Sequence, residues 1–83
     1  MSARIFKFTL RPDVQEFSGL TRLLGVGWQG DDLRLWAEYD EDDRRTTQII
    51  VALTGQAPPM DCDFVGTAVG TPFVLHVYSR GPA

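Results

Sequence analysis

The sequence predicts a mainly β fold: a small antiparallel sandwich or partly closed barrel of about six strands, with little helix. Three observations support this prediction. Short runs alternate between apolar and polar residues with the period of a strand. Clusters of Gly, Pro and Asp separate these runs at short intervals. The chain has 83 residues and no linker, so we expect a single domain over residues 1–83.

The first strand is predicted at residues 4–10. Its apolar residues fall on one side, which we expect to face the core, and they are Phe6, Phe8 and Leu10. The segment Arg11-Pro12-Asp13 ends the run. Residues 14–18 are short and poorly patterned, so we expect only a loop or a single turn there.

A hairpin is predicted over residues 20–39. Residues 20–28 form a strand whose two glycines, Gly25 and Gly27, indicate a bulge or a close backbone neighbour. Residues 29–32 read Gln-Gly-Asp-Asp, which is typical of a tight turn. Residues 33–39 alternate again, and the residues predicted to face inward are Leu33, Leu35, Ala37 and Tyr39.

Three more strands are predicted in the second half. Residues 45–54 are too apolar for a strand with one wet face, so this strand is expected to be central or covered on its outer face. Residues 55–61 contain two prolines and form a loop. Residues 64–69 and 73–79 form two short strands joined through Gly70-Thr71-Pro72, and residues 80–83 are expected to be a frayed tail.

Composition excludes several classes of function. Eleven acidic and eight basic residues give a net charge of −3, which argues against direct nucleic-acid binding. No apolar run is long enough for a membrane span or a signal peptide, so a cytoplasmic location is expected. The single Cys62 cannot form an intrachain disulfide. A homodimer is therefore one expected way to hide sheet edges and to add core.

The inventory of reactive side chains predicts that the protein is not an enzyme. With one His and one Cys, a nucleophile, base and orienting group are hard to assemble, and no cofactor is expected. His76 lies in an apolar run and is expected to be partly buried and satisfied by hydrogen bonds. The run Asp40 to Asp43 lacks the spacing of a calcium loop, so no metal site is predicted.

A partner-binding surface is predicted around the strand at residues 33–39 and the turn that follows. Trp36 lies between two charged residues on the less apolar face, and aromatic and Arg side chains often anchor interfaces. Four carboxylates at a loop tip could dock against a basic surface. The predicted surface consists of Arg34, Trp36, Glu38, Asp40, Glu41, Asp42 and Asp43. The alternative is that Trp36 is covered and that the acidic turn, pinned by Arg44 and Arg45, is merely solvated.

Several blocks together resemble a family of small domains carried by bacteriophages and prophages, which has no established activity. The blocks are Leu23-Leu24-Gly25-Val26, Leu33-Arg34-Leu35-Trp36-Ala37, Thr54-Gly55-Gln56-Ala57-Pro58-Pro59, Phe64-Val65-Gly66-Thr67 and Val74-Leu75-His76-Val77-Tyr78. The resemblance covers nearly the whole chain. Gln56 stands where the family tends to carry His, so no role of that histidine is carried over.

The resemblance implies a phage accessory protein. The resulting expectation is a binding protein that inhibits a host defence complex, as an anti-CRISPR protein does, by occupying a basic surface that normally binds nucleic acid. Two alternatives stay open. The first is a small-ligand domain, such as one for a signalling nucleotide, with a pocket near Trp28, Tyr39 and residues 55–59 and with Arg side chains converging on it. The second is a virion or assembly component.

Overall fold

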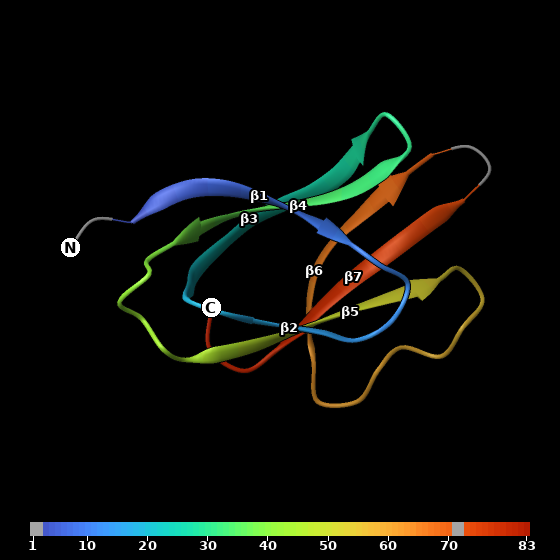
Figure 1. Ribbon diagram of the computed structural model, residues 1–83. Coiled ribbons are helices and arrows are strands. Elements are labelled where there is room, and N and C mark those ends of the chain that lie inside the picture. The colour runs from blue at the N-terminus through green and yellow to red at the C-terminus, as the bar shows by residue number, and fades with distance from the viewer. Residues whose placement is uncertain (1–2, 71–72) are drawn as a thin grey trace.

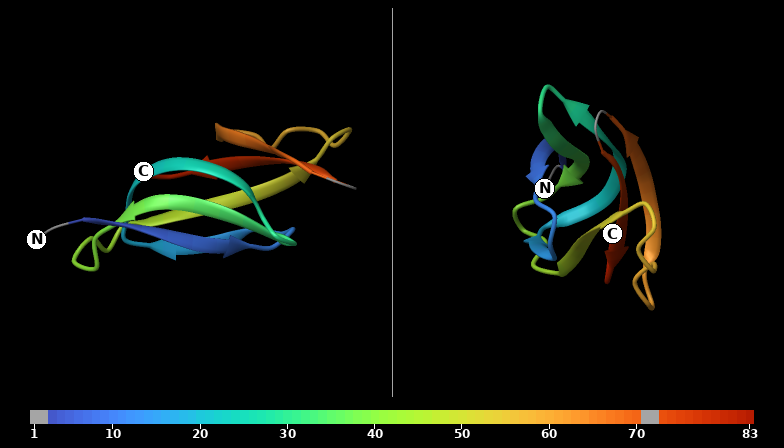
Figure 2. Two further views of the ribbon diagram at one scale, coloured as in Figure 1. Left: turned by 90° about the horizontal axis from the view of Figure 1, so that it is seen from above. Right: turned by 90° about the vertical axis from the view of Figure 1, so that its right-hand side faces the viewer.

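The computed structural model describes residues 3–70 and 73–83, which form seven strands in two antiparallel sheets (Figure 1). The strands are β1 (Arg4–Leu10), β2 (Gln15–Ser18), β3 (Leu20–Gln29), β4 (Asp32–Tyr39), β5 (Thr46–Leu53), β6 (Asp63–Val69) and β7 (Val74–Arg80). The described residues contain no helix. The predicted sandwich is confirmed, and the two sheets do not close into a barrel (Figure 2).

The three-stranded sheet has the order β1-β4-β3. The predicted hairpin is confirmed: β3 and β4 pair antiparallel around Gly30, whose φ of 62° suits the tight turn. Two register shifts in β3, between Leu20 and Arg22 and between Leu23 and Gly25, are the predicted irregularity. Strand β1 pairs with β4 on the other side, which places Phe8 opposite Leu35.

The four-stranded sheet has the order β2-β5-β7-β6. Strand β5 is central, as its apolar sequence predicted. Strand β2 was not predicted: residues 14–18 were expected to form a loop or a turn, yet Gln15–Ser18 pair with Ile49 to Thr46 of β5. Four residues carry too little pattern to identify a strand, and the pairing with β5 supplies what the local sequence lacks.

Gly19 joins the two sheets. It separates β2 in one sheet from β3 in the other and has a φ of 90°. Its N–H donates to the carbonyl of Arg45, and its carbonyl accepts from the N–H of Asp40. A Cβ at this position would lie 2.7 Å from Tyr39 Cε1 and 2.8 Å from the Asp40 carbonyl oxygen. Only glycine fits this crossing without strain.

The core lies between the sheets and is built from aliphatic side chains, most of them leucine. The three-stranded sheet contributes Leu10, Leu20, Leu33, Leu35 and Ala37, and the four-stranded sheet contributes Ile49, Ala68, Leu75 and Val77. The strand residues predicted to face inward on β4 do so, with Leu35 and Ala37 fully buried. The aromatic side chains pack at the margin of this cluster rather than inside it.

The end of the chain is held more firmly than the frayed tail that the sequence predicted. Arg80 belongs to β7, and its guanidinium donates to Gln48 and to the carbonyl of Met60. The Thr47 hydroxyl donates to the carbonyl of Pro82. Of the predicted connection Gly70-Thr71-Pro72, residues 71 and 72 lie outside the described residues.

Candidate functional site

Trp36 lies on the outer face of the three-stranded sheet, with its ring near Gly27 of β3. Its register partner is Gly25, and a Cβ at Gly27 would lie 3.8 Å from the indole ring. The side chain is partly buried as a result. A large ring packed over backbone that carries no side chains of its own stabilises the sheet, which is a structural use of Trp36.

The two charged neighbours of Trp36 on this face are also engaged within the sheet. The Arg34 guanidinium donates to the Thr9 hydroxyl and, at 3.2 Å, to Asp32. Glu38 lies 3.8 Å from Arg22. Since Arg34 is held from both sides, it is poorly placed to reach a partner.

Two of the four carboxylates in the acidic turn accept hydrogen bonds from within the turn itself. Asp40 accepts a hydrogen bond from the N–H of Asp42 at 2.9 Å. Asp43 accepts from the Arg45 N–H at 2.9 Å and from its guanidinium at 2.7 Å. These hydrogen bonds, with the side-chain ones strongest, lower the pKa of Asp43 from 3.8 to about 2, and the same contact raises the pKa of Arg45. Glu41 and Asp42 remain exposed.

The structure therefore splits the predicted surface into two parts. Arg34, Trp36 and Glu38 share the outer face of β4, whereas the residues 40–43 form a turn beyond the end of that strand. A surface that uses both parts would run from the outer face of β4 onto the turn that directly follows it. Its role in binding stays a prediction.

His76 has the satisfied environment that the sequence predicted. It is partly buried in β7, and its ring nitrogens lie 2.8 Å from the Thr54 hydroxyl and 3.0 Å from the Thr67 hydroxyl. Gln56 has a structural contact as well, since its side-chain oxygen accepts from the N–H of Leu53 at 2.7 Å and closes the loop after β5.

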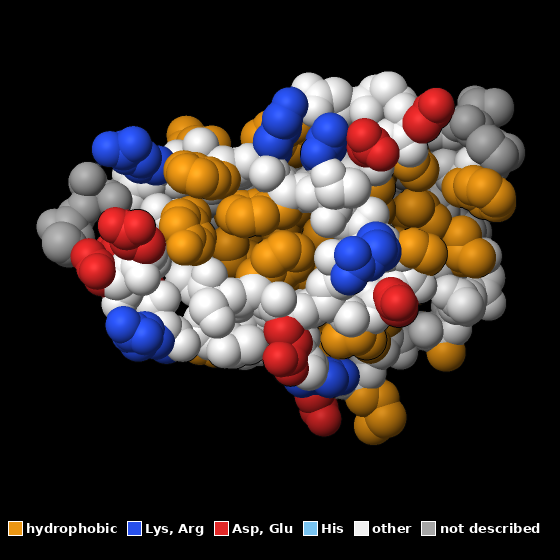
Figure 3. Space-filling model, viewed as in Figure 1, with side chains coloured by type: hydrophobic (Ala, Val, Ile, Leu, Met, Phe, Trp, Pro, Cys, Tyr) orange, Lys and Arg blue, Asp and Glu red, His pale blue; other side chains and the backbone are white. Residues whose placement is uncertain are grey.

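A cluster of four aromatic rings lies on the flank of the sandwich between β1 and β2, and of these rings the sequence predicted only Tyr39 as a candidate site residue. Phe8 of β1 lies 5.3 Å from Phe17 of β2, and Phe6 lies 5.3 Å from Tyr39 (centroid distances). We call Phe6, Phe8, Phe17 and Tyr39 the aromatic cluster. Apolar side chains gather between β1 and β2 on the face shown in Figure 3. Phe6 is 44% exposed.

This flank is open because the two sheets approach each other on one side only. The edge strands β3 and β6 pack together, whereas the described parts of β1 and β2 contact each other marginally at most. Rings rather than backbone span the gap at the aromatic cluster. The sequence predicted correctly that Phe6 and Phe8 face inward, but alternation alone does not tell whether the opposite sheet covers them.

Strand β1 forms the margin of this open flank. It is an edge strand, so alternate backbone N–H and C=O groups along its seven residues point away from β4. It carries Arg4 and Lys7 and no carboxylate. The edge is thus basic, although the chain as a whole is acidic.

A comparison with protein families adds the chain's membership. The model of a domain of unknown function, DUF7352, matches residues 1–83, which is the full length of the chain. The protein belongs to the DUF7352 family. Comparisons of this DUF7352 domain with curated proteins and with solved structures gave no significant match.

Two further findings concern the described part of the DUF7352 domain. Within residues 3–70 and 73–83, no group of three or more His, Cys, Asp and Glu side chains is placed to hold a metal ion. No helix in these residues is long and apolar enough to cross a membrane.

Proposed function

We propose that this DUF7352 domain is a protein-binding module that accepts an extended strand of a partner protein along the edge of β1. The observation that carries the proposal is Phe6, a ring on an edge strand that belongs to the aromatic cluster and is nevertheless 44% exposed. A strand added beside β1 would cover this ring and pair the edge at the same time.

Strand addition suits the edge for a physical reason. The outward N–H and C=O groups of β1 offer a partner backbone regular hydrogen bonds, and its side chains would alternate between the aromatic cluster and the outer face. Covering the exposed part of Phe6 alone contributes about 1 kcal/mol, since full burial of such a side chain contributes about 1.5–3 kcal/mol. Backbone pairing and further apolar contacts add to this.

Charge restricts the chemistry of the partner strand. Lys7, on the outer face, favours acidic residues on that side of a partner strand, whereas Phe6 and Phe8 favour apolar residues on the other side. Arg4, at the start of the strand on the face of Phe6, adds a second positive charge to the edge. A second copy paired through its own β1 would bring four cations into one ribbon with no carboxylate to offset them. The proposed occupant is therefore an acidic, apolar-alternating strand of another protein.

The finer prediction, that the partner is a host defence complex and the protein an inhibitor of the anti-CRISPR kind, rests on the resemblance to phage-borne domains. It stays a prediction, as do the homodimer and the virion component. The acidic turn and Trp36 would serve that role on a basic partner surface, whereas the β1 edge favours an acidic strand. The two surfaces thus predict partners of opposite charge.

The proposal is tested by selecting, from random 12-residue peptides displayed on phage, those that bind the folded protein. The affinity of the enriched peptides is then measured by calorimetry. We expect enriched peptides to alternate apolar residues with acidic ones. The Phe6→Ser variant should bind them at least tenfold more weakly. Methylation of alternate backbone nitrogens of the peptide should also abolish binding, because it blocks the ladder hydrogen bonds.

The matched control is Phe64→Ser. Phe64 is 60% exposed and stacks edge-on against Tyr78 at 5.6 Å, but it lies on β6 of the other sheet. Circular dichroism confirms that both variants fold. Equal loss of affinity in both variants, binding that survives Phe6→Ser, or selection without the acidic alternating pattern would each reject strand addition at β1.

A further inference from the structure

A second apolar feature lies at one end of the sandwich, apart from the aromatic cluster. Here the end of β1, the turn of the β3–β4 hairpin and the end of β5 surround a cavity of about 430 Å³. This volume lies within the range of small-molecule sites, roughly 300–1,000 Å³. The apolar walls come from Leu10, Trp28, Leu33, Val51, Leu53 and Leu75.

The floor of the cavity belongs to the core and is fixed. Leu10, Leu33 and Leu75 are 8% exposed or less. Trp28 forms one wall, and its ring is packed against the backbone at Gly70, where a Cβ would lie 2.6 Å from Cδ1 and 2.9 Å from Cε2 of the indole. A wall held this closely presents a flat ring that does not need to reorganise when a ligand arrives.

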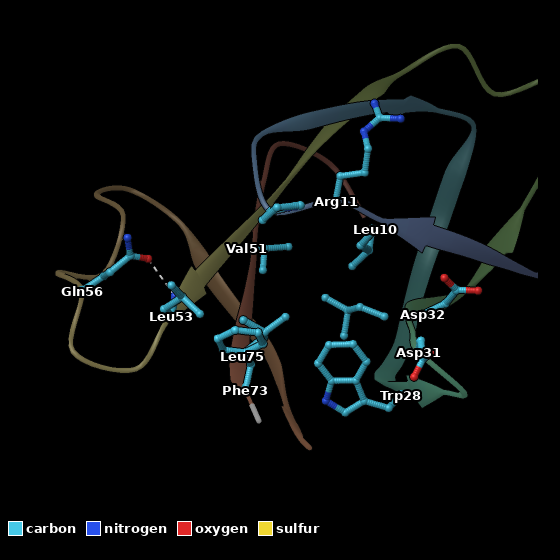
Figure 4. A pocket seen from close by; sticks show the side chains of 12 residues that line it. Leu10, Arg11, Trp28, Asp31, Asp32, Val51, Leu53, Gln56, Phe73 and Leu75 are labelled. Carbon is cyan, nitrogen blue, oxygen red and sulfur yellow. Dashed lines mark hydrogen bonds between the residues drawn. The ribbon is translucent and has the colours of Figure 1, made fainter. Parts of the chain in front are cut away.

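The mouth of the cavity exposes apolar side chains. Phe73 is 55% exposed and Leu53 is 42% exposed, and both line the opening (Figure 4). An apolar molecule seated between them and Trp28 would remove these side chains from water.

The polar side chains that line the cavity lie at its rim, and those of Arg11, Asp32 and Gln56 point away from the interior or are paired with other groups. Figure 4 shows the Arg11 side chain directed away from the apolar walls. Asp32 is paired with Arg34 at 3.2 Å, and the side-chain oxygen of Gln56 is bonded to the Leu53 N–H. Among the described lining residues, no cations converge on the space that a phosphate would occupy. The cavity therefore lacks the Arg side chains that a pocket for a signalling nucleotide was expected to have. Tyr39, also expected there, is absent from the lining residues.

We propose that this cavity is a binding site for one small, uncharged aromatic molecule, whose ring stacks on Trp28 and whose body fills the space above Leu33 and Leu75. This site is separate from the strand-binding edge proposed above and does not depend on it. The ligand class follows from the apolar walls, the flat indole and the lack of an inward-pointing charged partner among the described lining residues.

The test uses two probes that share a ring system, 2-naphthol and 2-naphthyl phosphate, with the methyl groups of Leu and Val labelled for NMR. We expect 2-naphthol to shift the methyl signals of Leu10, Val51 and Leu75, with a dissociation constant on the order of 0.1–1 mM. The phosphate should bind at least tenfold more weakly, because its charge would be desolvated without a partner.

Two variants with similarly exposed leucines locate the site. Leu53→Asp at the mouth should weaken 2-naphthol binding at least tenfold, whereas Leu24→Asp on β3 should leave it unchanged, since these leucines are 42% and 41% exposed. Equal affinity for both probes, methyl shifts that avoid the cavity, equal effects of the two variants, or no shift at millimolar 2-naphthol would each overturn the assignment.

Discussion

At the scale of single residues, two glycines with positive φ differ in how crowded they are. Gly30 has a φ of 62° with nothing within 4 Å of a built Cβ, whereas at Gly19, with a φ of 90°, a Cβ would meet Tyr39 and the Asp40 carbonyl. Gly30→Ala should cost about 1 kcal/mol from the left-handed backbone. Gly19→Ala should cost about 1–3 kcal/mol more from overpacking. Urea denaturation of both variants gives the difference, and equal costs would mean that the corner is not tightly closed.

Asp43 gives a prediction about pH. Its pKa in the folded protein is about 2, below the ordinary value of 3.8, because Arg45 donates several hydrogen bonds to the carboxylate. A depressed folded pKa stabilises the fold above about pH 4, and this contribution is lost as the pH falls toward 2. The stability difference between the wild type and Asp43→Asn should therefore be constant above pH 4 and shrink below it. An Asp43 carboxyl that titrates near pH 4 by NMR would contradict the contact.

The sequence predicted the surroundings of His76 but not those of Trp36. His76 was expected to be satisfied by hydrogen bonds, and the two threonines confirm it. The sequence leaves two interpretations of Trp36 open, an interface anchor and a covered ring. The contact that covers it comes from Gly27, which lies on β3, and the register between β3 and β4 is shifted just before this point. The sequence of β4 alone therefore does not show the contact between Trp36 and β3.

At the scale of elements, β4 and β1 present the two rival binding surfaces, and a pair of variants separates them. Trp36→Ala should lower the free energy of unfolding by about 1–2 kcal/mol, because the partly buried ring covers the backbone of β3 at Gly27. It should leave binding of the selected peptides unchanged. Phe6→Ser should have the reverse pattern, with a small stability cost and a large loss of binding. Loss of peptide binding in Trp36→Ala would return the interface to the outer face of β4.

Strand positions follow largely from the sequence because each long strand has one buried face, which enforces alternation. Strand β1 has the predicted bounds, and β3 to β7 differ from prediction only at their ends. Strand β2 could not be predicted from the sequence, because its four residues form a strand only through pairing with β5 and the corner at Gly19. Local patterning is weakest where tertiary contacts decide the structure.

At the scale of the molecule, the open flank could not be predicted from the sequence. The alternation of β1 assigns Phe6, Phe8 and Leu10 to one side, and the structure agrees. Whether that side is covered depends on the distance between the edge strands β1 and β2, and in the described residues the sheets come together at β3 and β6 instead. Leu10 is buried and Phe6 is 44% exposed, although both belong to the same apolar row.

The shared core predicts that the two sheets unfold together. Leu35 of one sheet and Ile49 and Val77 of the other are fully buried in one cluster, and the chain crosses between sheets at Gly19. Both tryptophans lie in the three-stranded sheet, and the single histidine lies in the other. Tryptophan fluorescence and the ring signal of His76 should therefore follow one transition in urea.

Leu35→Ala tests the strength of that coupling. Stability at this length is roughly 4–12 kcal/mol, and removal of a fully buried leucine costs about 2–5 kcal/mol. The midpoints of the transitions seen by tryptophan fluorescence and by the His76 ring signal should therefore shift to lower urea together, with an unchanged dependence of the unfolding free energy on urea. Leu24→Ala, which removes a leucine that is 41% exposed, is the control and should shift neither probe strongly. If the tryptophan transition moves while that of His76 stays, the sheets are separate cooperative units and the core between them contributes less than its burial implies.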